Sequence, residues 1–232
     1  MKKIIITIFT LILGITSYFG VIETNDNKIN DHNDTIHSYN IGEIPEYSGK
    51  DYIYINNNEP SFTEEDLTNK NKEFFSDLDS LGRCGQVYAF VSKDTMPTEK
   101  RGPIGMVKPS GWHTVKYDII DGKYLYNRCH LIGYQLTGEN ANVKNLITCT
   151  RHTNAQTMLK FENKVAEFVK NGGTVLYRVT PIFEGNNLLA NGIQIEALST
   201  NDNGSGIKFN VYIYNVQEGI DIDYKTGESK LK

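Results

Sequence analysis

Three residues within one short segment have side chains that could do acid–base, metal and anion chemistry together. The segment YNRCHLIGYQLTGENANVKNLITCTRHTN covers residues 126–154 and contains Arg128, His130 and Asn154. A neutral imidazole accepts a proton near neutral pH, because its usual pKa is about 6.5. An amide oxygen can bind Mg²⁺, and a guanidinium can bind anionic oxygens. These residue types suit hydrolysis at phosphorus, in which a water is deprotonated and negative charge develops.

The spacing of these residues resembles a known family. N-R-C-H at 127–130, N-L at 145–146 and Asn154 are similar to the D-R-G-H, N-L and asparagine motifs of the bacterial DNA/RNA non-specific endonucleases. These are ββα-metal (His-metal finger) enzymes, and the resemblance is greatest to secreted DNases of Gram-positive bacteria. It extends over about residues 44–224. It implies a nuclease that hydrolyses DNA, and RNA as well, through the phosphate backbone and leaves 5′-phosphate products.

The resemblance also implies roles for single residues. His130 is expected to be the general base, and Asn154 the protein ligand of one Mg²⁺, with Mn²⁺ as a substitute. Glu162 follows Asn154 by eight residues, so on a straight helix the two are about 80° apart in azimuth and roughly 12 Å apart in rise. That rise is too long for both to bind one ion directly; the family resemblance implies instead that Glu162 holds a metal-bound water. The alternatives are a surface role for Glu162 and a helix cap for Asn154.

Four basic residues are candidates for contact with the substrate. Arg128 and Arg178 are expected to stabilise charge at the reacting phosphate, although Arg128 could instead bind a carbonyl or carboxylate of the protein. Arg151 and Lys160 are expected to contact the nucleic-acid backbone. Trp112 and His113 could line the groove, but we prefer a buried position for Trp112.

The charge is unevenly distributed along the chain. The formal net charge is −4, which by itself argues against a polyanionic partner. Residues 83–178, however, contain 14 Lys or Arg and 7 Asp or Glu. The candidate site thus lies in a basic part of an acidic chain, which favours a nucleic-acid partner.

The cysteines leave a second function open. The sequence departs from the family motif at Asn127, which replaces Asp, and at Cys129, which replaces Gly. Cys129 could pair with Cys149 in a disulfide, or both could join His130 and His152 in a Cys₂His₂ zinc site. That zinc site would make the protein a zinc-stabilised extracellular binding module without catalysis. A secreted adhesin or carbohydrate-binding domain, suggested by the Tyr-rich strands, would leave His130 and Asn154 unexplained.

The N-terminus has the pattern of an export signal. Lys2 and Lys3 precede the uncharged residues 4–22, which predicts a signal peptide over residues 1–22 and a secreted protein. The alternative is an uncleaved anchor at the cell surface, because about 20 apolar residues span a bilayer. Without such an anchor we expect no stable membrane partner, and the sequence identifies no inhibitor. Residues 23–45 are polar and are expected to be a flexible linker.

The remaining residues, 46–232, are expected to form one endonuclease domain that positions the site. Alternation and turn residues predict strands at 51–57, 86–92, 174–183, 192–198 and 207–216. Apolar residues at helical spacing predict a helix over 153–171 that ends at Gly172. The expected fold class is α+β: a ββα-metal nuclease core with an antiparallel sheet and flanking helices.

Overall fold

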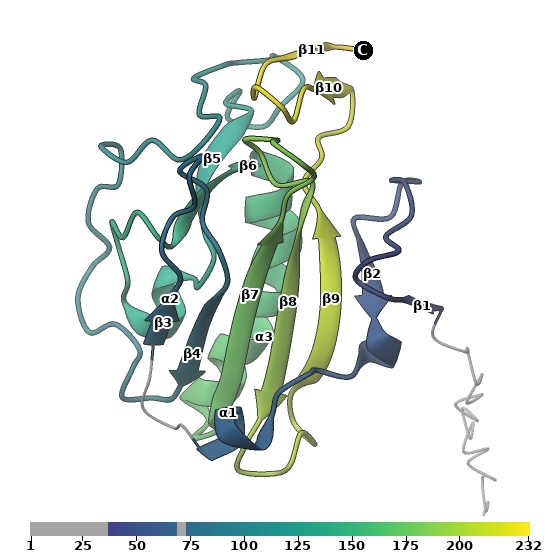
Figure 1. Cartoon of the computed structure of the whole chain (residues 1–232). Coiled ribbons are helices and arrows are strands. Elements are labelled where there is room, and N and C mark those ends of the chain that lie inside the picture. Colours follow the sequence, from purple (N-terminus) through teal and green to yellow (C-terminus); the bar gives the residue numbers. More distant parts are fainter. Residues whose placement is uncertain (1–36, 69–72) are drawn as a thin grey trace, which may run out of the picture. The chain divides into compact units, whose positions relative to one another are not determined.

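The computed structural model describes residues 37–68 and 73–232 (Figure 1). Within these residues seven strands form one sheet in the order β1-β2-β9-β8-β7-β4-β3, antiparallel except for the parallel pair β1–β2. The strands are β1 (Ser38–Tyr39), β2 (Tyr52–Ile55), β3 (Glu73–Phe75), β4 (Val87–Val91), β7 (Val175–Ile182), β8 (Gly192–Ser199) and β9 (Lys208–Tyr214). The five strands predicted from alternation are therefore present as β2, β4, β7, β8 and β9.

One face of this sheet is covered by the long helix α3 (Leu159–Lys170) (Figure 1). Its apolar side chains Phe161, Val165 and Val169 join Tyr177 and Val179 of β7 in the main core. Side chains three and four residues apart share a helix face, so this spacing gives one continuous apolar stripe. The helix ends at Lys170, and Gly172 follows with φ +93°, a left-handed conformation that favours glycine.

A separate hairpin leads into this helix. Strand β5 (Tyr126–His130) pairs antiparallel with β6 (Leu146–Thr150), and β6 is followed at once by a π-helical turn (Thr153–Met158) and α3. Two strands and a helix are thus formed by the segment that contains the N-R-C-H motif. The remaining elements are short: α1 (Glu64–Thr68), α2 (Tyr134–Thr137), the 3₁₀ turn Asn56–Asn58, β10 (Ile220–Ile222) and β11 (Ser229–Leu231).

The linker predicted over residues 23–45 ends earlier than expected. Strand β1 at Ser38–Tyr39 pairs with β2, and Tyr39 and Ile44 pack against a small core that contains Ile55 and Tyr214. These few apolar residues offset part of the entropy cost of ordering the segment. The predicted signal peptide and residues 23–36 lie outside the described residues. Among the described helices, none is long and apolar enough to cross a membrane.

Candidate active site

The loop between β5 and β6 is closed by Asn145. Its Oδ1 accepts a hydrogen bond from the Ile132 amide at 2.8 Å, and its Nδ2 donates to the Ile132 carbonyl at 3.0 Å. The Asn145 side chain is fully buried, so no water can replace these bonds without rearrangement. Asn145 therefore fixes the chain directly after His130, the last residue of β5.

The orientation of the His130 ring is set by a backbone carbonyl. Its Nε2 lies 2.7 Å from the carbonyl oxygen of Asn140, so Nε2 carries the proton and donates it to that oxygen. Nδ1 then carries the lone pair and lies 3.2 Å from a terminal nitrogen of Arg101. This tautomer leaves the imidazole with an accepting nitrogen, which is what a general base requires.

Burial keeps this imidazole neutral. His130 is 6% exposed, and burial lowers its pKa to about 4, with the Arg101 charge acting in the same direction. The hydrogen bond to Asn140 opposes this shift without cancelling it. At neutral pH His130 is thus unprotonated and able to accept a proton.

The helix that carries Asn154 is capped by another residue. The helical conformation starts at Arg151, and the Thr150 hydroxyl oxygen accepts a hydrogen bond from the Thr153 amide at 3.0 Å. This is N-cap geometry. Asn154 lies in the first helical turn, so the cap that sequence reasoning offered for Asn154 belongs to Thr150. The Leu159 amide donates to the Asn154 carbonyl five residues earlier, and such π turns are frequent at functional sites.

A cavity of about 470 Å³ opens beside this helix turn. Asn127 and Asn154 line it, and so do Arg101, Arg128 and Arg151, while its described lining contains no Asp or Glu. Residues 37–68 and 73–232 contain no group of three or more His, Cys, Asp or Glu placed to hold a metal ion. The amide oxygens available here fit a hard cation that keeps most of its own water. They do not provide the several nitrogen or sulfur ligands of a structural zinc site.

Arg128 is held rigidly at the edge of this cavity. Its Nε donates to the Val107 carbonyl and its Nη2 to the Gly105 carbonyl at 2.9 Å. Its guanidinium lies 3.9 Å from the ring centroid of Trp112, which is partly buried rather than buried as predicted and also lines the cavity. The structure shows the second role considered for Arg128, a contact with protein carbonyls, and its role at the reacting phosphate stays a prediction.

Glu162 is buried below the same region. It is 8% exposed, and burial raises the pKa of its carboxyl to about 7, against the opposing effects of Gln135 and Arg101. A Cβ added at Gly133 would lie 2.5 Å from Glu162 Oε2, so the missing side chain at 133 makes room for the carboxyl. The structure therefore excludes the alternative that Glu162 is an ordinary surface residue.

Arg101 is the residue that sequence reasoning missed. It comes from the segment between β4 and β5, 29 residues before His130, yet it contacts His130 Nδ1 and lines the cavity. Its charge also lowers the pKa of the Glu162 carboxyl, against the effect of burial. The excess of Lys and Arg within residues 83–178 indicated that this part of the chain binds an anionic partner. It could not single out Arg101, because the loop that carries Arg101 has no periodic pattern.

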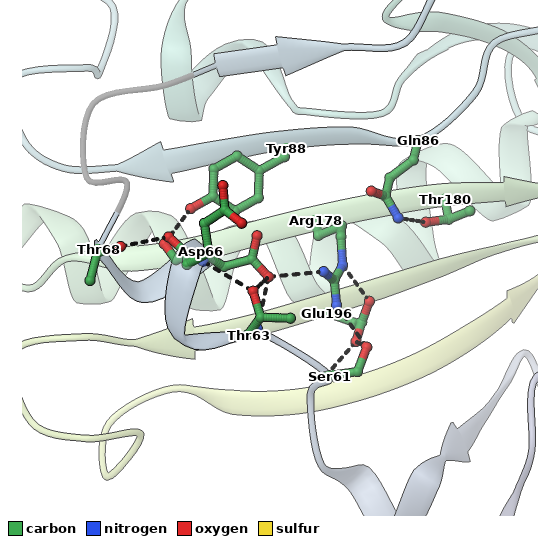
Figure 2. Close-up of polar contacts among 10 residues, drawn as sticks. Ser61, Thr63, Asp66, Thr68, Gln86, Tyr88, Arg178, Thr180 and Glu196 are labelled. Carbon is green, nitrogen blue, oxygen red and sulfur yellow. Dashed lines mark hydrogen bonds and ion pairs between the residues drawn. The ribbon is translucent and has the colours of Figure 1, made fainter.

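Arg178 lies elsewhere, and its predicted role at the phosphate is wrong. Side chains alternate along a strand, so Tyr177 of β7 faces α3 while Arg178 faces the opposite side of the sheet. There Arg178 Nε donates to Glu196 at 2.7 Å and Nη2 to the Ser61 hydroxyl at 2.7 Å, as Figure 2 shows. Its guanidinium also lies 4.6 Å from the ring centroid of Phe62. These contacts join the segment that leads into α1 to the sheet.

The two residues predicted to contact the nucleic-acid backbone, Arg151 and Lys160, lie in different places. Arg151 lines the cavity and pairs with Asp121 at 2.8 Å. Lys160 does not line the cavity; it lies 4.8 Å from the ring centroid of Tyr52 on β2. Its contact with the nucleic-acid backbone stays a prediction.

The Cys₂His₂ zinc site is wrong. Cys129 and Cys149 form a disulfide, with Cα atoms 5.9 Å apart, so neither can supply a thiolate ligand. His152, the fourth expected ligand, instead pairs with Asp51 at 2.8 Å. The cysteine that replaces the glycine of the family motif therefore cross-links β5 to β6 beside His130.

Comparison with known proteins agrees with this geometry. A family model described as "DNA/RNA non-specific endonuclease" matches residues 63–201. The structure of NucA from Streptococcus agalactiae with magnesium bound is similar, with a TM-score of 0.71 and 26% identity over 83% of this chain and 94% of that chain. The metal-free NucA structure gives a TM-score of 0.70 and 27% identity over 83% and 92%. The Sda1 nuclease with a bound zinc ion gives 0.58 and 27% over 69% and 80%. The chain therefore belongs to the DNA/RNA non-specific endonuclease family and has the α+β fold of its ββα-metal nucleases.

Proposed function

We propose that this protein is a secreted endonuclease that hydrolyses phosphodiester bonds of DNA, and of RNA, with His130 as general base and one Mg²⁺ held by Asn154. The observation that carries this proposal is the tautomer of His130, whose accepting nitrogen contacts Arg101; Arg101 lines the cavity, and His130 lies behind it. Mg²⁺ is preferred because the lining offers amide oxygens, and NucA binds magnesium. The Sda1 structure with zinc leaves the choice of ion to experiment.

Each of these residues has a separate role in the proposed hydrolysis. His130 Nδ1 accepts the proton of the attacking water. Arg101 and Arg128 line the cavity and bind the phosphate oxygens on which charge develops. A phosphate that draws Arg101 towards itself also uncovers Nδ1, so binding frees the base. Asn154 would hold a divalent cation, which would supply charge neutralisation at the phosphate and at the departing 3′ oxygen, with a 5′-phosphate as product.

Export is part of the same proposal. Residues 1–22 have the pattern of a signal peptide, and the Cys129–Cys149 disulfide is a bond that persists in oxidising surroundings. Other similar structures are described as extracellular nucleases. Activity in the culture medium is the expected result, whereas activity confined to the cytosol would contradict export.

The experiment is a digestion of plasmid DNA and of RNA by the purified protein, with Mg²⁺ or with EDTA. His130→Ala should lower the rate by about 10²–10⁴-fold, the contribution of a general base. His113→Ala is the matched control, because His113 is exposed and contacts the Thr226 carbonyl away from the cavity lining. Full activity of His130→Ala would refute the assignment of the base.

A further inference from the structure

The cavity beside Asn154 has a second wall made of aromatic residues. Trp112, Tyr124 and Tyr126 line it together with the arginines. Two of these rings are already engaged: Trp112 stacks with Arg128, and the buried Tyr126 donates its hydroxyl hydrogen to the Gly227 carbonyl at 2.9 Å. Tyr124 also has a cation beside its ring, Lys116, but it differs from the other two in being 45% exposed while it lines the cavity.

The position of Tyr124 is fixed by a tight hairpin. The Lys123 amide donates to the Ile120 carbonyl at 2.8 Å and the Leu125 amide to the Val115 carbonyl at 3.1 Å. Lys123 has φ +66°, an uncommon conformation for a residue with a side chain, so the turn is specifically constrained. The backbone that carries Tyr124 is therefore ordered by the turn itself, at the rim of the cavity.

The hairpin is also tied to the helix that carries Asn154. Asp121 pairs with Arg151 at 2.8 Å, and a Cβ at Gly122 would lie 3.4 Å from the Arg151 guanidinium. On the other strand of the hairpin, the Lys116 ammonium lies 4.5 Å from the centroid of the Tyr124 ring. The Tyr124 ring thus contacts one cation, Lys116, and its hairpin is joined through Asp121 to a second, Arg151.

We propose that Tyr124 stacks on a nucleobase next to the scissile phosphate, and that the enzyme therefore prefers strands whose bases are unpaired. This inference rests on the proposed nuclease function and specifies its substrate. A nucleotide joins an anionic phosphate to a flat aromatic base, and the cavity joins three arginines to an exposed aromatic ring. In a duplex both faces of each base are covered by its neighbours, so a protein ring can reach a face only after the base leaves the stack.

Stacking tolerates every base, because each has a π face. A platform such as Tyr124 therefore selects single-stranded over double-stranded nucleic acid without selecting a sequence. The arginines and the cation act on the backbone and are indifferent to pairing. In this proposal strand preference depends on Tyr124, whereas catalysis depends on other residues, His130 and the arginines.

The test compares Tyr124→Ala with Tyr124→Phe on one oligonucleotide, supplied single-stranded and as a duplex. Tyr124→Ala should lower kcat/KM on the single strand on the order of tenfold more than on the duplex. Tyr124→Phe keeps the ring and should therefore keep the wild-type preference for the single strand. Tyr47→Ala is the matched control, since Tyr47 is 40% exposed and does not line this cavity. An unchanged ratio of the two rates in Tyr124→Ala would overturn the inference.

A binding measurement separates this inference from the proposed function. In a His130→Ala background, 2-aminopurine in a single strand should lose fluorescence on binding, and adding Tyr124→Ala should abolish that quenching. Quenching that persists without Tyr124 overturns the stacking proposal even if the wild type cleaves DNA. A wild type that cleaves no nucleic acid, with quenching still dependent on Tyr124, overturns the proposed function and leaves the stacking site.

Discussion

Removing the Cys129–Cys149 disulfide should destabilise the fold and with it the hairpin that carries His130. The perturbation is Cys129→Ala with Cys149→Ala, or chemical reduction of the wild type. The two cysteines are 20 residues apart, and the loss of chain entropy on closing a loop of that length corresponds to about 3 kcal/mol. For a chain of this size, 3 kcal/mol lowers Tm by roughly 6–12 °C.

The assay is urea unfolding with and without reductant, with the thiol content of each sample measured by mass spectrometry. The free energy of unfolding of the wild type should fall by about 3 kcal/mol on reduction, whereas the double variant should not respond. Cys84→Ala is the matched control. Cys84 is buried like the other two cysteines but is a free thiol, so this variant reports the loss of packing without loss of a cross-link.

Activity gives the second half of the result. The disulfide links β5 to β6 next to His130, so the reduced protein should lose activity at lower urea concentrations than the oxidised protein. A wild type that is fully reduced by mass and yet keeps its unfolding free energy would refute the reasoning. It would mean that the hairpin is held by packing and by Asn145 alone.

Three further predictions concern the site. Burial lowers the pKa of His130 to about 4, so as the pH falls from about 6.5 towards 4 the unfolded chain gains a proton that the folded chain does not. Unfolding free energy should therefore decrease over that window in the wild type and decrease less in His130→Ala, and equal slopes would contradict the shift. Gly133→Ala should reduce kcat, because its backbone angles suit alanine and the clash is with the Glu162 carboxyl, and this overpacking of a buried site should cost about 1–3 kcal/mol of stability. Full activity would argue against a role for Glu162. Asn154→Ala should raise the Mg²⁺ concentration needed for activity while circular dichroism stays unchanged, and unaltered Mg²⁺ dependence would exclude Asn154 as a ligand.

Local sequence patterns were enough to predict the main strands, the long helix and the family of this protein. The alternation in residues 174–183 predicts a strand, and the three- and four-residue spacing of Met158, Phe161 and Val165 predicts a helix, because each pattern is set by the geometry of the element itself. The N-R-C-H motif and Asn154 identified the family for the same reason. They lie in one continuous hairpin and helix, whose spacing is preserved in the chain.

Tertiary structure decided the rest, because it depends on residues far apart in the chain. Arg178 was assigned to the site by its charge, but on β7 a shift of one residue turns a side chain to the other face of the sheet. Arg101 enters the site through a loop without regular pattern. Thr150, and not Asn154, caps the helix because of the way β6 leads into it. Cys129 and Cys149 form a disulfide and not a zinc site because β5 and β6 place them side by side. Residue types thus indicated which chemistry to expect of this protein. Packing determined which of its arginines and histidines lie together at the candidate site.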